Sequence, residues 1–219
     1  MVKIFKISLL FLTTLIFLPP LLSAQSKLQR LETTIKKIEP FTCHFTQVYF
    51  DAFQNREAVS EGLFSFKQPG LMKWEYQSPE EMLFIVGSQT AWLYDPILEN
   101  VTIQDLDQVS GIRTMRFLSK NESISQHFKE TKPKTEYLDK VKNLESIFLV
   151  PIEKNQSLAE LQLAYNPKKN QIHQFVLVDQ NRNYRKITLT QIQVKQGLKE
   201  SDFEFTVTDS MEVIEGFAN

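Results

Sequence analysis

The sequence predicts a mainly β (α+β) fold, in which an antiparallel sheet carries a few short helices. Three observations support this prediction. Apolar and polar residues alternate with period two in many short runs after residue 40, which is the pattern of half-buried strands. Turn residues such as Pro69-Gly70 and Ser78-Pro79 separate these runs at hairpin spacing. Helical periodicity is confined to residues 26–38 and 105–128, and the length of 219 residues suits one domain.

The segment from Gly62 to Asp95 predicts four consecutive antiparallel strands. Phe64 and Phe66 alternate with polar residues, and an almost wholly apolar run from Met82 to Val86 follows two turns later. Both tryptophans of the chain lie in this segment. Two interpretations are open at this point: the core of an ordinary β-sandwich, or a sheet whose apolar concave face binds a ligand.

Residues Ser26 to Ile38 predict an amphipathic helix. Ser26 is a suitable N-cap, and leucines and isoleucines recur at helical spacing on one side. Pro40 ends the helix because proline cannot continue the hydrogen-bond ladder. The apolar stripe predicts that this helix packs on the sheet.

Further strands follow from the same alternation. They are expected at Phe41 to Phe53, Ala58 to Lys67, Val101 to Gln104, Glu145 to Val150, Ala159 to Tyr165, Gln171 to Val178, Tyr184 to Val194 and Phe203 to Val207. Residues 129–144 are polar and charged, and they predict either a strand with solvated flanks or a strand followed by a loop. Between them, residues 105–128 carry apolar residues at spacings of three to six and predict one or two short helices, broken at Gly111 and near Asn121.

The N-terminus predicts a cleaved secretory signal peptide at residues 1–24, followed by a functional domain at 25–219. Lys3 and Lys6 precede an apolar run from Ile7 to Leu18, which is short for a membrane span. Ala24 offers the small residue that cleavage requires, so Gln25 is the expected first residue of the mature chain. An uncleaved anchor is the alternative.

Composition narrows the class of function. The segment 25–219 carries 23 basic and 26 acidic side chains, a net charge of −3, which argues against nucleic acid as the main partner. Seventeen phenylalanines need a core or an apolar ligand. Known catalytic and phosphate-binding motifs are absent from the sequence, and His44, His127 and His173 do not lie at metal-ligand spacing. We therefore expect no enzymatic activity, no metal and no cofactor.

Cys43 is the only cysteine, which excludes an intramolecular disulfide. It does not lie at the expected cleavage site, where a lipoprotein would carry its own lipid. It is interpreted as a small buried apolar residue.

A specific run of residues resembles the LolA family of periplasmic lipoprotein carriers. The matching positions are Gly62, Phe64, Lys67, Pro69, Trp74, Pro79, Gly87, Trp92, Tyr94, Asp95 and Pro96. The similarity extends upstream through Leu28 to Gln47 and, more weakly, downstream to Phe205. The resemblance implies an open, half-closed antiparallel β-barrel whose short helices form a lid over an apolar concave face. It also implies a soluble periplasmic chaperone.

The resemblance further implies the partners of such a chaperone. It would bind the acyl chains of lipoproteins released by an inner-membrane ABC transporter and deliver them to an outer-membrane receptor, and it would travel as a monomer. The floor of the groove is predicted at Phe64, Phe66, Met72, Trp74, Tyr76, Phe84 and Trp92. The lid is predicted at Leu106, Ile112, Met115 and Leu118. The assignment of faces depends on register, because a one-residue slip reverses every side chain.

Two positions depart from the family pattern. The family carries an arginine immediately before the motif proline, where Gln68 stands in this chain, and that arginine holds the lid closed through backbone carbonyls. Gln68 can donate the same hydrogen bonds without a charge, so it is the predicted lid latch. Lys67, Arg113 and Arg116 are the alternatives for this role. The family also carries a proline before the lid helix, and this chain has none there.

Two other classes of function compete with the carrier. A lipid-binding or lipid-sensing module of the same fold, acting in envelope stress signalling, would carry an additional domain. A secreted hydrolase would show carboxylates or histidines with perturbed pKa values in a polar cleft, whereas a carrier would show an apolar groove.

Overall fold

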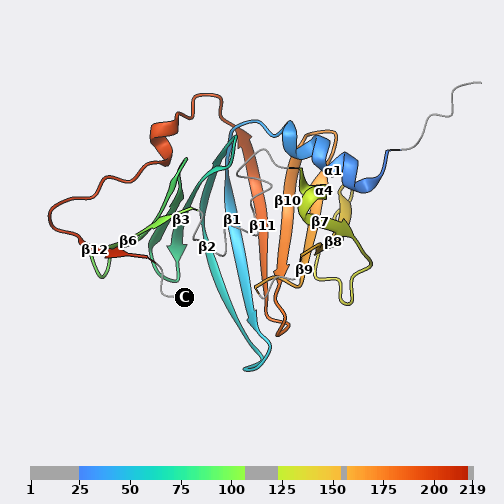
Figure 1. The fold of residues 1–219 in the computed structure, drawn as a ribbon, viewed down its shortest axis with the longest axis horizontal. Coiled ribbons are helices and arrows are strands. Elements are labelled where there is room, and N and C mark those ends of the chain that lie inside the picture. Colours follow the sequence, from blue (N-terminus) through green and yellow to red (C-terminus); the bar gives the residue numbers. More distant parts are fainter. Residues whose placement is uncertain (1–24, 107–122, 154–156, 217–219) are drawn as a thin grey trace, which may run out of the picture.

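One twelve-stranded sheet forms the body of the computed structural model, which describes residues 25–106, 123–153 and 157–216 (Figure 1). The helices are α1 (Lys27–Lys36), α4 (Ile124–His127) and a 3₁₀ helix at Glu200–Phe203. The strands are β1 (Phe41–Asp51), β2 (Arg56–Lys67), β3 (Leu71–Ser78), β4 (Met82–Val86), β5 (Thr90–Asp95), β6 (Asn100–Asp105), β7 (Phe128–Glu130), β8 (Glu145–Pro151), β9 (Glu160–Asn166), β10 (Gln171–Val178), β11 (Tyr184–Val194) and β12 (Glu212–Glu215).

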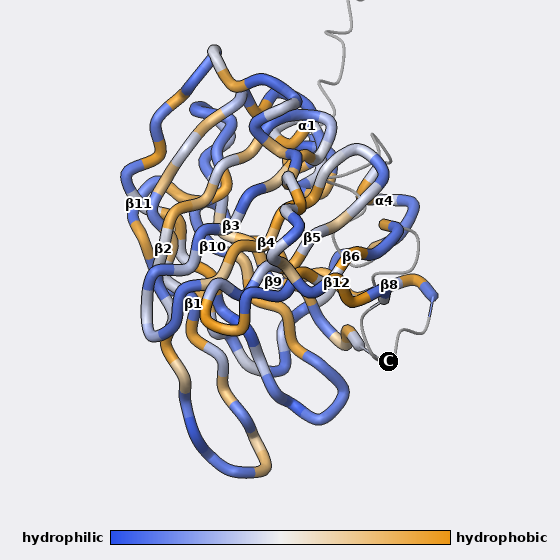
Figure 2. The backbone as a smooth tube through the Cα atoms, turned by 90° about the vertical axis from the view of Figure 1, so that its left-hand side faces the viewer, coloured by the Kyte–Doolittle hydropathy of each residue, from blue (hydrophilic) through white to orange (hydrophobic). Residues whose placement is uncertain are grey.

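The sheet consists of two antiparallel meanders that meet at β1. The strand order is β12-β6-β5-β4-β3-β2-β1-β11-β10-β9-β8-β7, and only the β12–β6 pair is parallel. β1 pairs with β2 along its whole length and with β11 on the other side. Short hydrophobic and hydrophilic stretches alternate along the backbone, as Figure 2 shows. The two edges of the described sheet do not pair with each other, so the sheet is open.

The sheet is strongly curved, which creates a concave face. The ring of Trp74 on β3 contacts the ring of Phe175 on β10, with centroids 6.3 Å apart, although β2, β1 and β11 lie between these strands in the sheet. A contact across three intervening strands requires the sheet to fold over on itself. The predicted half-closed antiparallel barrel is confirmed.

Helix α1 covers part of the concave face (Figure 1). A capping box starts it: the Ser26 hydroxyl accepts a hydrogen bond from the Gln29 backbone N–H at 3.2 Å, and the Gln29 side chain accepts one from the Ser26 N–H at 3.0 Å. Leu31 and Ile35 are buried in the main core cluster on that face. The predicted helix is therefore confirmed, with ends one or two residues inside the expected range.

The C-terminal segment differs from the prediction. A strand was expected at Phe203 to Val207, and this expectation is wrong. Residues Glu200–Phe203 form a 3₁₀ helix, and the last strand, β12, lies further on and pairs with β6. Phe203 is fully buried against Leu71 and Ile85 on the convex face, so its burial comes from packing on the sheet and not from strand pairing.

The region between the two meanders is described only in part. β7 has three residues, and no strand is assigned from residue 131 to 144, so of the two expectations for 129–144 the strand-plus-loop form is the correct one. Most of the expected helical region at 105–128 lies outside the described residues. Its described end contains the short helix α4.

Candidate functional site

An apolar groove lies on the concave face, beside the loop that follows α1. Aliphatic and aromatic side chains from the loop after α1 and from β1, β2, β9, β10 and β11 line it: Ile38, Phe41, Phe64, Phe66, Leu161, Leu163, Ile172, Phe175, Leu177 and Leu189. These ten residues define the apolar groove below. None of them carries a charge or a side-chain hydrogen-bonding group, so a ligand here would be held by non-directional burial.

Aromatic rings pack against one another along the groove floor and behind it. Phe64 lies 4.0 Å from Trp74 between ring centroids, and Phe41 contacts both Phe64 and Phe66. Phe45 meets Trp74 at 5.0 Å in a T-shaped arrangement. Such offset and edge-to-face pairs are the arrangements that aromatic quadrupoles favour, and they fix the shape of the floor.

Gly62 allows this packing. A Cβ atom at Gly62 would lie 2.0 Å from the Glu75 carbonyl oxygen and 2.9 Å from the Phe45 ring. The β2–β3 register shifts between Glu61 and Gly62, so the strand bends here and its backbone approaches β3 closely. The glycine of the sequence motif is therefore a packing requirement of the sheet.

The groove is narrow in this structure. Its free volume is about 40 Å³, close to the space of a single water molecule. A long acyl chain is larger than this space and cannot lie in it without displacing the side chains that line it. Binding of such a ligand therefore requires the groove to widen.

The N-terminal half of α1 is held to β8 and β9 by polar contacts. The Arg30 guanidinium donates from Nε and Nη2 to Glu145 Oε2 at 3.1 and 3.0 Å. The Tyr165 hydroxyl lies 3.2 Å from the same carboxylate oxygen and 3.3 Å from the Lys27 carbonyl. This end of the helix therefore has several polar contacts with the sheet.

Glu32 connects α1 to α4. Its carboxylate accepts hydrogen bonds from the Ser123 hydroxyl and from the Ser125 N–H, the latter at 3.0 Å. Burial acts to raise the pKa of Glu32, but the hydrogen bonds from the two serines hold it below its usual value. The ionised carboxylate therefore stabilises the contact between the two helices.

The C-terminal half of α1 is joined to the sheet by Gln68. The Gln68 amide donates from Nε2 to the backbone carbonyl of Ile35 at 2.9 Å. The predicted latch residue thus contacts a backbone carbonyl of α1, whereas the lid that it was expected to hold is predicted at Leu106 to Leu118. That Gln68 controls closure remains a prediction.

Six of the seven predicted floor residues fall into three groups on the concave side. Phe64 and Phe66 line the apolar groove, and Met72 and Trp74 are buried in the same cluster. Tyr76 and Phe84 are partly buried and pack against that cluster. That these six residues contact lipid stays a prediction.

Trp92 lies on the opposite face, so its assignment to the groove floor is wrong. It packs with Ile85 and Phe203 on the convex side, and its ring would be 2.8 Å from a Cβ atom at Gly87. Register explains the difference: Trp92 pairs with Ile85, whereas Ala91 pairs with the concave-facing Val86. Phe84 of β4 faces the concave side and Trp92 of β5 faces the convex side, so these two residues do not share one face as predicted.

Of the predicted lid, only Leu106 can be located. It is partly buried and packs against the concave cluster, and its N–H donates to the Gln89 carbonyl at 3.0 Å. Ile112, Met115 and Leu118 lie outside the described residues.

The second half of the groove was missed from the sequence. Leu161, Leu163, Phe175 and Leu189 line it from β9, β10 and β11. The alternation within these strands was visible, but the sequence does not show that they fold over onto the first meander. Only β1–β11 pairing and the curvature of the sheet bring them opposite Phe64.

Cys43 is buried in the concave cluster and has a free thiol. Burial raises the pKa of the thiol to about 12, so it stays protonated and unreactive. The interpretation as a small buried apolar residue is confirmed.

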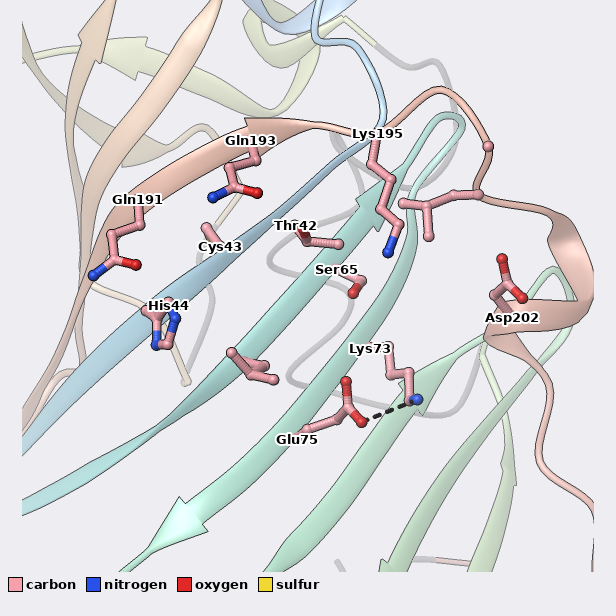
Figure 3. Close-up of a pocket in the computed structure, with 13 residues that line it drawn as sticks. Thr42, Cys43, His44, Ser65, Lys73, Glu75, Gln191, Gln193, Lys195 and Asp202 are labelled. Atoms are coloured by element: carbon pink, nitrogen blue, oxygen red, sulfur yellow. Dashed lines mark ion pairs between the residues drawn. The ribbon is translucent and has the colours of Figure 1, made fainter.

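A larger, polar cleft of about 460 Å³ lies on the convex face (Figure 3). Gln191 and Gln193 of β11, Lys195 just after it, and Ser65 of β2 line it. Lys73 pairs with Glu75 at 3.1 Å within the cleft. Asp202 accepts a hydrogen bond from the Lys199 N–H at 2.7 Å. Both carboxylates of this cleft are thus engaged in local contacts.

Within the described ranges, no three side chains of His, Cys, Asp or Glu gather closely enough to hold a metal ion. None of the described helices is long and apolar enough to cross a membrane.

Comparisons with known proteins give the family. The profile of the family described as "Outer membrane lipoprotein carrier protein LolA" matches residues 36–206. An outer-membrane lipoprotein carrier protein from Pseudomonas aeruginosa PAO1 is 30% identical over 188 residues, covering 85% of this chain and 86% of that protein. One from Shewanella halifaxensis is 28% identical over 216 residues, covering 97% and 96%.

A structural relative supports the fold alone. An uncharacterized conserved protein from Thermus thermophilus superposes with a TM-score of 0.50 at 14% identity, covering 86% of this chain and 96% of that one. The family profile spans most of the sequence and the Pseudomonas relative matches it over most of both lengths. The chain belongs to the LolA family of outer-membrane lipoprotein carrier proteins.

Proposed function

We propose that this protein is a periplasmic carrier that binds the acyl chains of lipoproteins in the apolar groove and moves them from the inner to the outer membrane. The observation that carries the proposal is the groove itself, whose lining is wholly apolar. Family membership supports the same function.

The energetics of acyl chains explain why such a groove suits a carrier. Each methylene exposed to water costs about 0.8 kcal/mol, so three long chains would cost about 30 kcal/mol. A carrier must remove most of this cost and must later release the chains. A fully packed core has no room for a guest, whereas a groove with a movable cover can be filled and emptied.

The cover in this proposal is α1, together with the segment that follows Leu106. The Arg30–Glu145 contacts hold the N-terminal end of α1, and the Gln68 hydrogen bond to Ile35 is the contact that breaks when the groove opens. Cargo enters from an inner-membrane ABC transporter and leaves to an outer-membrane receptor. The carrier acts as a monomer, without a cofactor and without a catalytic step.

Delivery to the periplasm requires export. Residues 1–24 act as a signal peptide that is removed before Gln25. N-terminal sequencing of the protein from the native host tests this step, and retention of residues 1–24 would refute it.

Displacement of an apolar dye tests binding. A triacylated lipopeptide is expected to displace the dye from the purified chain 25–219, and the same peptide without acyl chains is expected to leave it bound. Phe175→Glu, which places a charge in the groove lining, is expected to abolish dye binding. His44→Glu on the exposed side of β1 is the control and is expected to bind dye normally. Equal displacement by the two peptides would contradict the proposal.

A further inference from the structure

Gln104 on β6 carries a buried acceptor without a partner. The residue is 8% exposed, and its Oε1 atom has no hydrogen-bond partner among the described residues. Buried polar groups in native proteins nearly always have a partner, because an unpaired one loses its hydration without compensation. An orphaned acceptor in an otherwise apolar region therefore needs an explanation.

The register of the sheet places Gln104 on the concave face. Directly paired residues of antiparallel strands share a face, and one unbroken row of pairs crosses six strands: Gln104, Ala91, Val86, Met72, Phe66 and Phe41. The last two line the apolar groove. Leu106, two residues beyond Gln104 on the same side, packs against the same cluster. Gln104 thus ends a row of side chains that continues into the groove.

Every other member of this row is apolar. Strands lie about 4.8 Å apart, so the row gives an extended apolar track across the sheet that ends at a single polar side chain. The side chains of Ala91, Val86 and Met72 are at most 2% exposed, so a ligand reaches this track only when the concave face opens, as the proposed function requires. An elongated ligand lying along this track, with its apolar part toward Phe66, would bring its polar end to Gln104. The available atom is an acceptor, so a matching ligand must present a donor.

We propose that Gln104 binds the polar junction of the cargo, its Oε1 accepting a hydrogen bond from the amide N–H that links an acyl chain to the peptide. This inference rests on the proposed carrier function. An amide-linked chain has one N–H at that junction, whereas an ester-linked chain has none. Gln104 thus distinguishes an acylated peptide from a lipid that carries only ester-linked chains.

A pair of ligands that differ in one donor group tests the proposal. One is an N-palmitoylated peptide, and the other is the same peptide with the acyl amide N-methylated, so that it keeps the chain and the carbonyl but cannot donate. Dye displacement from chain 25–219 gives both affinities. The wild type is expected to prefer the N–H ligand about five-fold, the size of one neutral hydrogen bond.

Two variants isolate the contribution of Gln104. Gln104→Met keeps an unbranched side chain of similar length without the amide, and it is expected to bind both ligands equally. Thr102→Val, on the same face of the same strand, is the matched control and should keep the five-fold preference. The quantity compared between variants is the ratio of the affinities for the N–H and the N-methyl ligand. Any conformational effect of the methyl group itself is the same for every variant and cancels in this comparison, as in a double-mutant cycle.

The outcomes separate this inference from the carrier function. If both ligands bind the wild type equally, the Gln104 inference is overturned and the carrier function stands. If neither binds, the carrier function fails. If Gln104→Met keeps the preference, the N–H is recognised elsewhere and the inference is overturned. The wild-type comparison needs no variant, so it remains decisive even if Gln104→Met does not fold.

Discussion

Gln68 is the predicted latch between a closed and an open groove. It makes a neutral hydrogen bond to the Ile35 carbonyl, in the position where the family pattern has an arginine. A hydrogen bond from a charged donor contributes about 1.5–3 kcal/mol, compared with about 1 kcal/mol for a neutral one. As the latch, the glutamine would therefore make closure weaker than an arginine by about 1 kcal/mol, a several-fold change in the closed-to-open ratio.

Gln68→Arg is accordingly expected to strengthen closure. Because a stronger latch favours the closed groove over the loaded, open one, it is also expected to speed the release of cargo to the receptor. Gln68→Met, which has a similar length and no donor, is the opposing control and should slow release. The measurement is the rate of lipoprotein transfer from loaded carrier to receptor for the three proteins. If all three rates agree, Gln68 is not the latch.

Gly62 provides a stability test of the floor. Gly62→Ala is expected to destabilise the protein by about 2 kcal/mol or more, because its Cβ would overlap the Glu75 carbonyl and force the backbone apart. Gly197→Ala is the control, since no atom lies within 4 Å of its added Cβ, and it should change stability by less than about 1 kcal/mol. Urea unfolding of both variants measures the difference. Similar losses at the two sites would contradict the close approach of β2 and β3.

Single residues were predicted well from the sequence where their role is local. Ser26 as an N-cap, Cys43 as a buried thiol and Gly62 as a motif position all follow from neighbours close in the chain. Trp92 was assigned to the wrong face because its direction depends on register through a turn, which alternation alone does not determine.

At the scale of elements, the α1–α4 contact depends on pH. The pKa of Glu32 is lowered in the folded state, because the hydrogen bonds from Ser123 and Ser125 together outweigh the opposing effect of burial. A lowered folded pKa means that the stabilisation is fully present above the unfolded carboxyl pKa and is lost as the pH falls through the folded value.

Glu32→Gln should therefore be less stable than the wild type at pH 7, and the difference should shrink as the pH falls below the ordinary carboxyl pKa of about 4.3. Thermal unfolding across this range measures it. Glu39→Gln serves as the control for loss of an exposed carboxylate close to the helix. A difference that is constant with pH would show that ionised Glu32 does not support the contact.

Elements were predictable where both the pattern and the pairing are local. The hairpins from β2 to β5 follow from alternation and turn residues. The C-terminal strand was misplaced because Phe203 reads as part of an alternating run, whereas it is buried by packing on the convex face. β12 consists of four exposed residues, and its pairing with β6 joins segments more than a hundred residues apart, which no local pattern reveals.

At the scale of the whole molecule, the groove results from joining two meanders. Neither meander alone encloses it, because Phe64 belongs to one and Phe175 to the other. The class of fold and the part of the groove on β2 could be predicted from the sequence. The part on β9, β10 and β11 could not, because it depends on the long-range curvature of the sheet. The groove of about 40 Å³ must expand to hold acyl chains.

Native mass spectrometry of the protein isolated from the periplasm of its native host tests the central claim most directly. The account predicts a complex of one chain with one acylated lipoprotein, which mild detergent separates into the chain starting at Gln25 and the intact lipoprotein. The Phe175→Glu variant, isolated in the same way, should appear without cargo. Wild-type protein that carries only phospholipid, or a lipoprotein bound equally by Phe175→Glu, would contradict the assignment of the apolar groove as a lipoprotein carrier site.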